Sequence, residues 1–217
     1  IAVRADAMME EGWFYEGAGI YRHVWLNITD KVFIPVDGIF VHSKVKGKNA
    51  EVTIETTVQN NNLKNSNCSV YSYITDRNGK ILAKTSEQKV ALGIRKDVTV
   101  KQKLNLNNAR LWSLEDPYLY KVISVVKQNN QIVHQTKTRF GIKTVQFDAN
   151  KGFFLNGKKI KIQGTNNHQD HAGIGSALPD YMQCYRIKLL NEMGSNSYRE
   201  SHNAPTPELL EACDSLG

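Results

Sequence analysis

The sequence predicts a mainly β protein, in which an immunoglobulin-like β-sandwich leads into the first β/α units of an incomplete TIM barrel. Three observations support this fold class. Short alternating apolar segments, separated by turn residues, fill the middle of the chain and are typical of a sandwich. After residue 141 the order becomes strand, helix, strand, helix, as in a parallel barrel. An alternating segment near the amino end indicates a further β domain.

Composition narrows the class of protein. The chain has 217 residues, 41% of them hydrophobic, which is enough to bury real cores. No apolar run approaches the roughly 20 residues of a membrane-spanning helix, so we expect no membrane association. The net charge of +7 is scattered and no nucleic-acid motif accompanies it, so we expect a solvated basic surface and no nucleic-acid partner. The odd, widely spaced cysteines argue against a disulfide framework and do not fix the compartment: Cys68, Cys184 and Cys213.

Residues 1–34 are expected to be the tail of a β domain. Apolar side chains alternate with aromatic and polar ones from Ile20 to Ile28, which predicts a strand. Arg22 interrupts the apolar face and needs a carboxylate or carbonyl partner. A glycine-rich aromatic loop, residues 12–19, precedes this segment, and its Gly-x-Gly does not follow a strand, which disfavours nucleotide binding.

Residues 35–144 carry the sandwich pattern. Alternating apolar residues predict strands around residues 52–58, 68–74, 98–106 and 131–140. The segment from Tyr118 to Val126 is apolar on both faces, as in a central strand. Trp112 and Tyr118 are expected to pack in the core between strands.

Residues 145–217 are expected to begin the barrel. Asn156-Gly157 predicts a hairpin turn, and Lys159–Gly164 predicts a strand. Asp180 is a candidate cap for a helix that ends at Gly194. The predicted buried face of this helix consists of Met182, Tyr185, Leu189 and Met193.

A second helix is predicted after Asn196–Glu200, which is extended in character. Thr206 is a good N-cap and Pro207 suits the first helical position. The predicted apolar stripe consists of Leu209, Leu210, Cys213 and Leu216. Polar residues gather between strand and helix, where α/β folds bind ligands: Arg199, Ser201, His202 and Asn203.

Two catalytic or metal-binding interpretations of these loops are weaker. His168, Asp170 and His171 could ligate a metal, but a loop fixes no common face for them and no Cys or Glu completes the set. Ser201 and His202 are adjacent, so their side chains point apart on an extended chain, and no nucleophile elbow surrounds them. We therefore expect neither a metal site nor a serine hydrolase.

Three segments resemble glycoside hydrolase family 2, in family order. Trp13-Phe-Tyr-Glu-Gly-Ala-Gly-Ile-Tyr-Arg22 resembles the end of the family's jelly-roll domain, and Leu111-Trp-Ser-Leu-Glu-Asp-Pro-Tyr-Leu-Tyr120 resembles a sandwich motif. Arg199-Glu-Ser-His-Asn-Ala-Pro-Thr-Pro-Glu-Leu-Leu210 resembles the β-galactosidase-like signature. This last segment departs from the family pattern at Glu200, normally small, and Ala204, normally proline. Glu200 is expected to put a charge beside the sugar site.

The resemblance implies site residues but no catalytic ones. His168 and His202 match histidines that bind sugar hydroxyls, and Arg199 matches an arginine that orients an active-site carboxylate. Asp170 and Asn203 complete the expected substrate-binding set. The alternative for Arg199 is a purely structural role, as an ion pair with Asp170 or Glu200. The two catalytic glutamates of a retaining glycosidase match no position of this chain.

The resemblance therefore implies an internal fragment of a β-galactosidase, inactive by itself, with a carbohydrate as its substrate and no cofactor of its own. A divalent cation in the full-length enzyme, and a homo-oligomer, are left open. β-Glucuronidase is the alternative within the family. A non-enzymatic β-sandwich for adhesion or carbohydrate binding is the alternative from another class, and it would not explain the β/α segment that carries His168 and His202.

Overall fold

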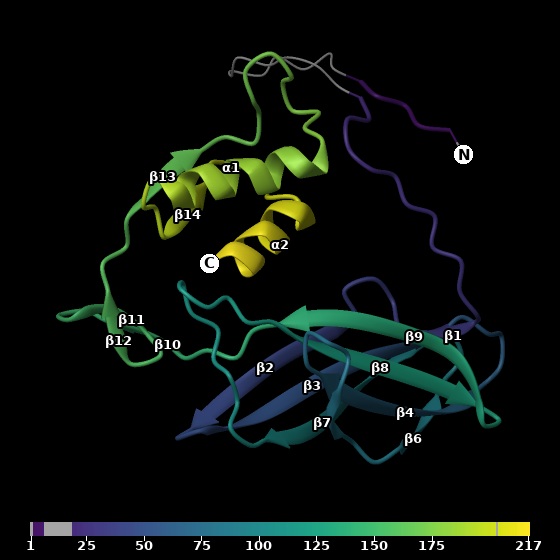
Figure 1. Ribbon diagram of the computed structural model, residues 1–217. Coiled ribbons are helices and arrows are strands. Elements are labelled where there is room, and N and C mark those ends of the chain that lie inside the picture. The colour runs from purple at the N-terminus through teal and green to yellow at the C-terminus, as the bar shows by residue number, and fades with distance from the viewer. Residues whose placement is uncertain (1, 7–18, 203) are drawn as a thin grey trace.

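The computed structural model describes residues 2–6, 19–202 and 204–217 of the chain (Figure 1). The predicted glycine-rich loop therefore lies outside the described residues except for Gly19, and so does Asn203. A β-sandwich occupies one side of the molecule, and two helices lie beside it with a short pair of strands (Figure 1). None of the helices in the described ranges is long and apolar enough to cross a membrane.

The sandwich consists of two antiparallel sheets. In the first, β3 (Asn49–Asn60) pairs with its three neighbours, β1 (Val32–Phe33), β2 (Ile39–Lys46) and β7 (Asp97–Leu106). In the second, the order is β5 (Ile81–Lys84), β4 (Ser66–Thr75), β8 (Tyr120–Gln128) and β9 (Gln131–Phe140), and β6 (Gln88–Leu92) also pairs with β4. The alternating segments predicted as strands within residues 35–144 all lie within these sheets.

Alternation determines which side chains fill the core between the sheets. Two clusters of buried apolar residues follow the inward positions of the strands, one around Ile54 and Ile74 and the other around Val58 and Val70. Tyr118 is 7% exposed and packs in the core, as predicted. Trp112 is buried as well, at 8% exposure, but it lies outside these clusters and bonds to Asp214 near the carboxyl end of the chain. Fully burying a large apolar side chain contributes roughly 1.5–3 kcal/mol, so the two buried clusters around Ile54 and Val58 are the main source of stability.

The sandwich core also contains a polar chain that links the two sheets. The Ser72 and Ser124 hydroxyls lie 2.9 Å apart, and Ser72 donates to Gln102 Oε1 at 3.0 Å. Gln102 in turn donates to the carbonyl of Val70 at 3.2 Å. Because buried polar groups are costly unless they are paired, this network makes the register of the facing sheets specific.

The strand predicted between Ile20 and Ile28 does not form a ladder. Residues 19–31 run as an irregular segment, and its apolar side chains are largely exposed, with Val24 at 74% and Ile28 at 88%. A strand needs a neighbour to satisfy its backbone groups, and no described segment pairs with this one. The alternating pattern was therefore not sufficient to predict structure here.

After the sandwich, a small hairpin sheet precedes the β/α segment. It is formed by β10 (Val145–Asp148), β11 (Gly152–Leu155) and β12 (Lys158–Ile160), all antiparallel. Asn156 and Gly157 form the predicted turn, both with positive φ angles of 52° and 77°. The predicted strand at Lys159–Gly164 was misplaced, because its first residues belong to this hairpin and the parallel strand β13 is Gly164–Asn167.

The β/α segment then continues with α1 (Asp180–Glu192), β14 (Ser197–Glu200) and α2 (Pro207–Leu216). The prediction for the start of α2 is confirmed, with Thr206 at the N-cap and Pro207 at the first helical position. Asp180 is the first residue of α1 and not its cap, which is Pro179. The order strand, helix, strand, helix predicted for the start of the barrel is therefore present.

The predicted buried face of α1 is wrong. Gln183 and Ile187 are its buried residues, whereas Tyr185 and Met193 are 50% and 67% exposed. Ile187 packs with Leu209 and Ala212 of α2 in a small third cluster. The helix carries two apolar stripes, and the contacts with α2 select the one that local periodicity did not favour. The stripe predicted for α2 differs similarly, because Leu210 is 53% exposed and Ala212 is buried.

Candidate functional site

The candidate site lies at the carboxyl ends of the two parallel strands. In β13 and β14, Asn166 pairs with Arg199, and the chain then leaves each strand in a polar loop. These loops bring His168 and His202 together, with ring centroids 5.7 Å apart in an edge-to-face arrangement. Both imidazoles are exposed. Two histidines 34 positions apart in the sequence thus share one accessible surface at the strand ends.

The close approach of the strands depends on a glycine. A Cβ atom placed on Gly164 would lie 2.1 Å from the carbonyl oxygen of Ser197, at the first register position of the pair. Only a residue without a side chain fits there. Gly164 therefore fixes the separation of the two strands, and with it the separation of the loops that carry His168 and His202.

Arg199 points to the same face of the strand pair as Asn166. Its Nη1 donates to Asn166 Oδ1 at 2.7 Å, and the side chain is exposed. A neutral amide leaves the guanidinium charge uncompensated by this contact. The geometry is that of a cation available to a further carboxylate, which is the role that the sequence resemblance implies for it.

Glu200 points toward the helices, yet it lies close enough to His168 for the charge of that histidine to lower its pKa. Side chains alternate along a strand, so Glu200 shares the face of Tyr198, which packs against the helices with Ile187 and Leu209. Both Glu200 carboxylate oxygens are buried. Burial raises the pKa of Glu200, and the positive charge of Arg186 is the largest influence opposing that rise.

Arg22 also lies close enough to Glu200 to lower its pKa, although its effect is smaller than that of Arg186. The Arg22 Nη2 atom is buried and has no hydrogen bond within the described part of the chain. A hydrogen bond from this atom to the carboxylate or carbonyl expected for Arg22 is therefore not present within the described ranges.

The loop after β13 is held from below by α1. Arg186 donates to the carbonyl oxygens of His168 and Asp170, at 2.8 and 2.5 Å. The Nδ1 atom of His171 is hydrogen-bonded to the carbonyl oxygen of Ala172 at 3.0 Å. The backbone of His171 forms hydrogen bonds with that of Gly175 and closes a turn. Sequence reasoning missed Arg186, because a single arginine on a helix carries no signal for contacts with a distant loop.

Ser201 cannot serve as an exposed nucleophile. It is fully buried, and its Oγ has no hydrogen-bond partner among the residues that the structure describes. A serine nucleophile needs a base within hydrogen-bond reach and an accessible oxygen. The geometry thus agrees with the expectation that Ser201 and His202 do not form a hydrolytic pair.

A separate group of titratable residues lies where α1 and α2 begin. His23 Nε2 and Asp180 Oδ1 are 2.7 Å apart, and the ligand atoms of His23, Asp180 and Glu208 all lie within 4.8 Å of one another. Carboxylates are favoured at helix amino ends by the helix dipole, and His23 adds an ion pair when it is protonated. Helix-end stabilisation therefore accounts for this group without a bound ion.

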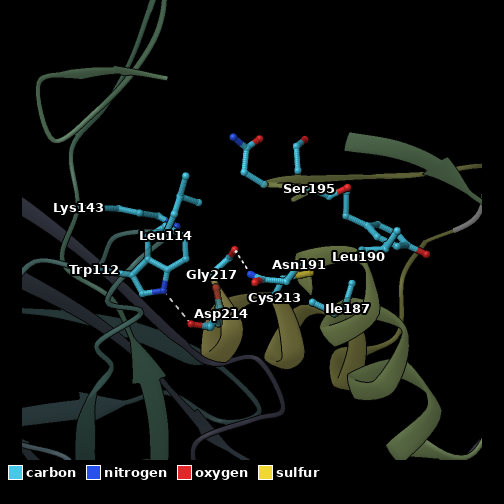
Figure 2. Close-up of a pocket in the computed structure, with 13 residues that line it drawn as sticks. Trp112, Leu114, Lys143, Ile187, Leu190, Asn191, Ser195, Cys213, Asp214 and Gly217 are labelled. Carbon is cyan, nitrogen blue, oxygen red and sulfur yellow. Dashed lines mark hydrogen bonds between the residues drawn. The ribbon is translucent and has the colours of Figure 1, made fainter. Parts of the chain in front are cut away.

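A cavity of about 170 Å³ lies between the sandwich and the β/α segment (Figure 2). It is lined by Trp112 and Lys143 of the sandwich side and by Asn191, Cys213 and Gly217 of the helices. Asn196 and Ser197, which also line it, are at the amino end of β14. The cavity is therefore at the opposite end of the strand from His202, and it is a gap between two packed units.

A sandwich joined to parallel β/α units, with imidazole and guanidinium groups at the strand ends, is the arrangement of a barrel domain that follows an accessory β domain. The family model for glycosyl hydrolases family 2 matches residues 33–143, and the model for the TIM barrel domain of that family matches residues 147–217. The chain belongs to glycosyl hydrolase family 2.

Individual relatives agree with this assignment. The chain is 37% identical over its whole length to the β-galactosidase BoGH2A of Bacteroides ovatus, and it spans 26% of that protein. It is 32% identical over 95% of its length to a β-glucuronidase of Formosa agariphila, and it spans 22% of that protein. A family 2 structure from Bacteroides cellulosilyticus matches 94% of the chain with a TM-score of 0.88 and 34% identity, over 28% of that structure. The chain thus spans about a quarter of the length of these relatives.

Proposed function

We propose that this chain is part of a retaining β-glycosidase, most specifically a β-galactosidase, and that it supplies one wall of the sugar-binding site. The observation that carries the proposal is the contact between the His168 and His202 rings at the carboxyl ends of paired parallel strands. In barrel enzymes, substrates bind at this end of the strands. The similarity to BoGH2A over the whole chain supports the choice of galactosides.

The proposed roles follow from the chemistry of each group. A neutral imidazole both donates and accepts hydrogen bonds, which suits His168 and His202 to sugar hydroxyls. The Arg199 guanidinium, exposed and bound only to an amide in its observed contact, would orient a catalytic carboxylate through two parallel hydrogen bonds. Asp170 and Asn203 complete the proposed substrate-binding set.

Retaining glycosidases need two carboxyl groups about 5–5.5 Å apart, one as acid and base and the other as nucleophile. No glutamate among residues 1–217 matches a catalytic position of the family, so we propose that these residues bind and position the sugar and do not cleave it. A divalent cation in the full-length enzyme remains compatible with this proposal.

β-Glucuronidase is the second candidate, because several relatives carry that name. A glucuronide has a carboxylate that needs cationic partners, and Arg199 is the exposed cation at the strand ends. The two candidates therefore differ in whether Arg199 serves an enzyme carboxylate or a substrate carboxylate.

Two measurements test the proposal. The natural gene product should hydrolyse an aryl β-galactoside with retention and act poorly on the matched aryl β-glucuronide, whereas the isolated 217-residue chain should hydrolyse neither. In the isolated chain, galactose should shift the imidazole NMR signals of His168 and His202 and leave His134, in the sandwich, unchanged. A preference for the glucuronide would favour the second candidate, and hydrolysis by the isolated chain would overturn the division between binding and catalysis.

A further inference from the structure

Arg186 connects three elements beneath the candidate sugar site. It lies on α1 and is half-buried. Its Nη1 donates to the His168 carbonyl at 2.8 Å and to the Tyr198 hydroxyl at 3.2 Å, and its Nη2 donates to the Asp170 carbonyl at 2.5 Å. One side chain thus ties the loop after β13 to the helix and to β14.

The two carbonyls that Arg186 binds belong to residues two positions apart. A guanidinium is a planar fork with donors at fixed positions, so its two terminal nitrogens can hold two such oxygens at once. A lysine ammonium has three donors on a flexible stem but no rigid fork, so it would hold the two carbonyls with less defined geometry. The contact is therefore specific for arginine, and it fixes both the position of the loop backbone and its orientation.

The electrostatic surroundings keep Arg186 in place. The buried carboxylate of Glu200 lies on the same side of β14 as Tyr198, and the Arg186 charge acts on it. Hydrogen bonds from a charged donor are roughly twice as strong as neutral ones. Attraction to the Glu200 carboxylate thus favours a position of Arg186 between β14 and α1, where its guanidinium reaches the loop after β13.

We propose that Arg186 is a positioning residue of the sugar site, which holds the backbone at His168 and Asp170 so that the His168 ring stays against that of His202. This inference rests on the proposed function, since it assigns to the loop the task of presenting His168 to a sugar. Arg186 acts through His168 and touches no substrate itself.

The first test is hydrogen exchange on the isolated chain, without sugar. In Arg186→Met, the amides of residues 168–176 should exchange about tenfold faster, because charge-assisted hydrogen bonds to two carbonyls are lost. The amides of the sandwich should be unchanged. Arg186→Lys should give an intermediate increase. The matched control is Lys188→Met, which removes an equal charge from an exposed position of the same helix.

Unchanged loop exchange in Arg186→Met would overturn the proposal. So would an increase spread equally over both helices and the sandwich, since that would indicate a general loss of stability. Wild-type protection of the loop in Arg186→Lys would also overturn it, because one charge without the fork would then suffice. If Arg186→Met does not fold, the lysine variant alone decides.

The second test links Arg186 to His168 in the natural gene product. Arg186→Met should lower kcat/KM for the aryl galactoside, and should lower it little further when His168→Ala is already present, because it acts through that ring. Fully additive losses would overturn the proposal. If the wild type neither binds nor hydrolyses galactosides, the proposed function fails, and the exchange result still decides separately whether Arg186 holds the loop.

Discussion

The indole Nε1–H of Trp112 donates to the carbonyl oxygen of Asp214 at 2.7 Å, across 102 positions of sequence. This bond joins the sandwich to the last turn of α2, beside the cavity between the two units (Figure 2). The ion pair of Arg139 with Glu211, at 2.7 Å, lies on the same interface. The β/α segment is therefore docked on the sandwich by a few directed contacts.

Trp112→Phe tests this docking. The ring keeps most of its apolar area, but the hydrogen bond to Asp214 is lost, at a cost of about 1 kcal/mol. We expect faster hydrogen exchange in α1 and α2 and little change in β4 and β8. The wild type should already protect the sandwich more strongly than the helices, because its core is larger. Equal protection of both parts in a wild-type monomer would contradict this expectation.

Glu200→Gln should change how stability depends on pH. Burial raises the pKa of Glu200 in the folded state above its unfolded value of roughly 4.3. Between these two values the folded state binds more protons than the unfolded state, so Glu200 favours folding at low pH, and this contribution is lost as the pH rises through the folded pKa.

The glutamine variant should therefore gain stability relative to the wild type as the pH is raised from about 4 to 7. Urea denaturation monitored through the exchange of α2 amides measures the difference. Glu192→Gln, an exposed position of α1, serves as the control and should show no such trend. If the difference in unfolding free energy between Glu200→Gln and the wild type stayed constant across this pH range, folding would not raise the pKa of Glu200, and the prediction would be wrong.

Gly164→Ala should separate β13 from β14. The added Cβ would lie 2.1 Å from the Ser197 carbonyl oxygen, which is backbone and cannot move aside cheaply. We expect a loss of more than ~1 kcal/mol in the stability of the β/α segment and a loss of the galactose response at His168. Gly93→Ala meets only the flexible Lys96 side chain and is the control. Unaltered His168 and His202 signals in Gly164→Ala would refute the close-approach explanation.

Ser124→Ala should destabilise the sandwich by about 1–3 kcal/mol, because it removes the oxygen to which the buried Thr56 hydroxyl donates and one of the two partners of the buried Ser72 hydroxyl. Ser69→Ala removes a hydroxyl that bonds to the exposed Glu87 carboxylate, and it should cost far less. Thermal denaturation of the two variants compares them directly. Equal losses of thermal stability in the two variants would contradict the claim that burial is what makes the hydrogen bonds of Ser124 costly to lose.

Much of the fold could be predicted because its signals are local. The alternating runs around Ile54, Ile74 and Leu104 determine their own burial, since every second side chain of a strand points to the same face. Asn156-Gly157 and Thr206-Pro207 determine a turn and a helix start from backbone preferences of the residues themselves. The segment from Ile20 to Ile28 had the same kind of pattern, but no strand among the described residues pairs with it, so its alternation did not produce a ladder.

For the candidate site, the sequence by itself determined which residues follow the two strands, including His168, Arg199 and His202. Only the tertiary structure decided that Glu200 faces the helices, that α1 buries Gln183 and Ile187, and that Arg186 holds the loop of His168. The physical reason is that these outcomes depend on contacts between segments 12 or more residues apart. Such contacts depend on how α1, α2 and β14 pack together. The spacing of residues within one helix or strand therefore does not predict them.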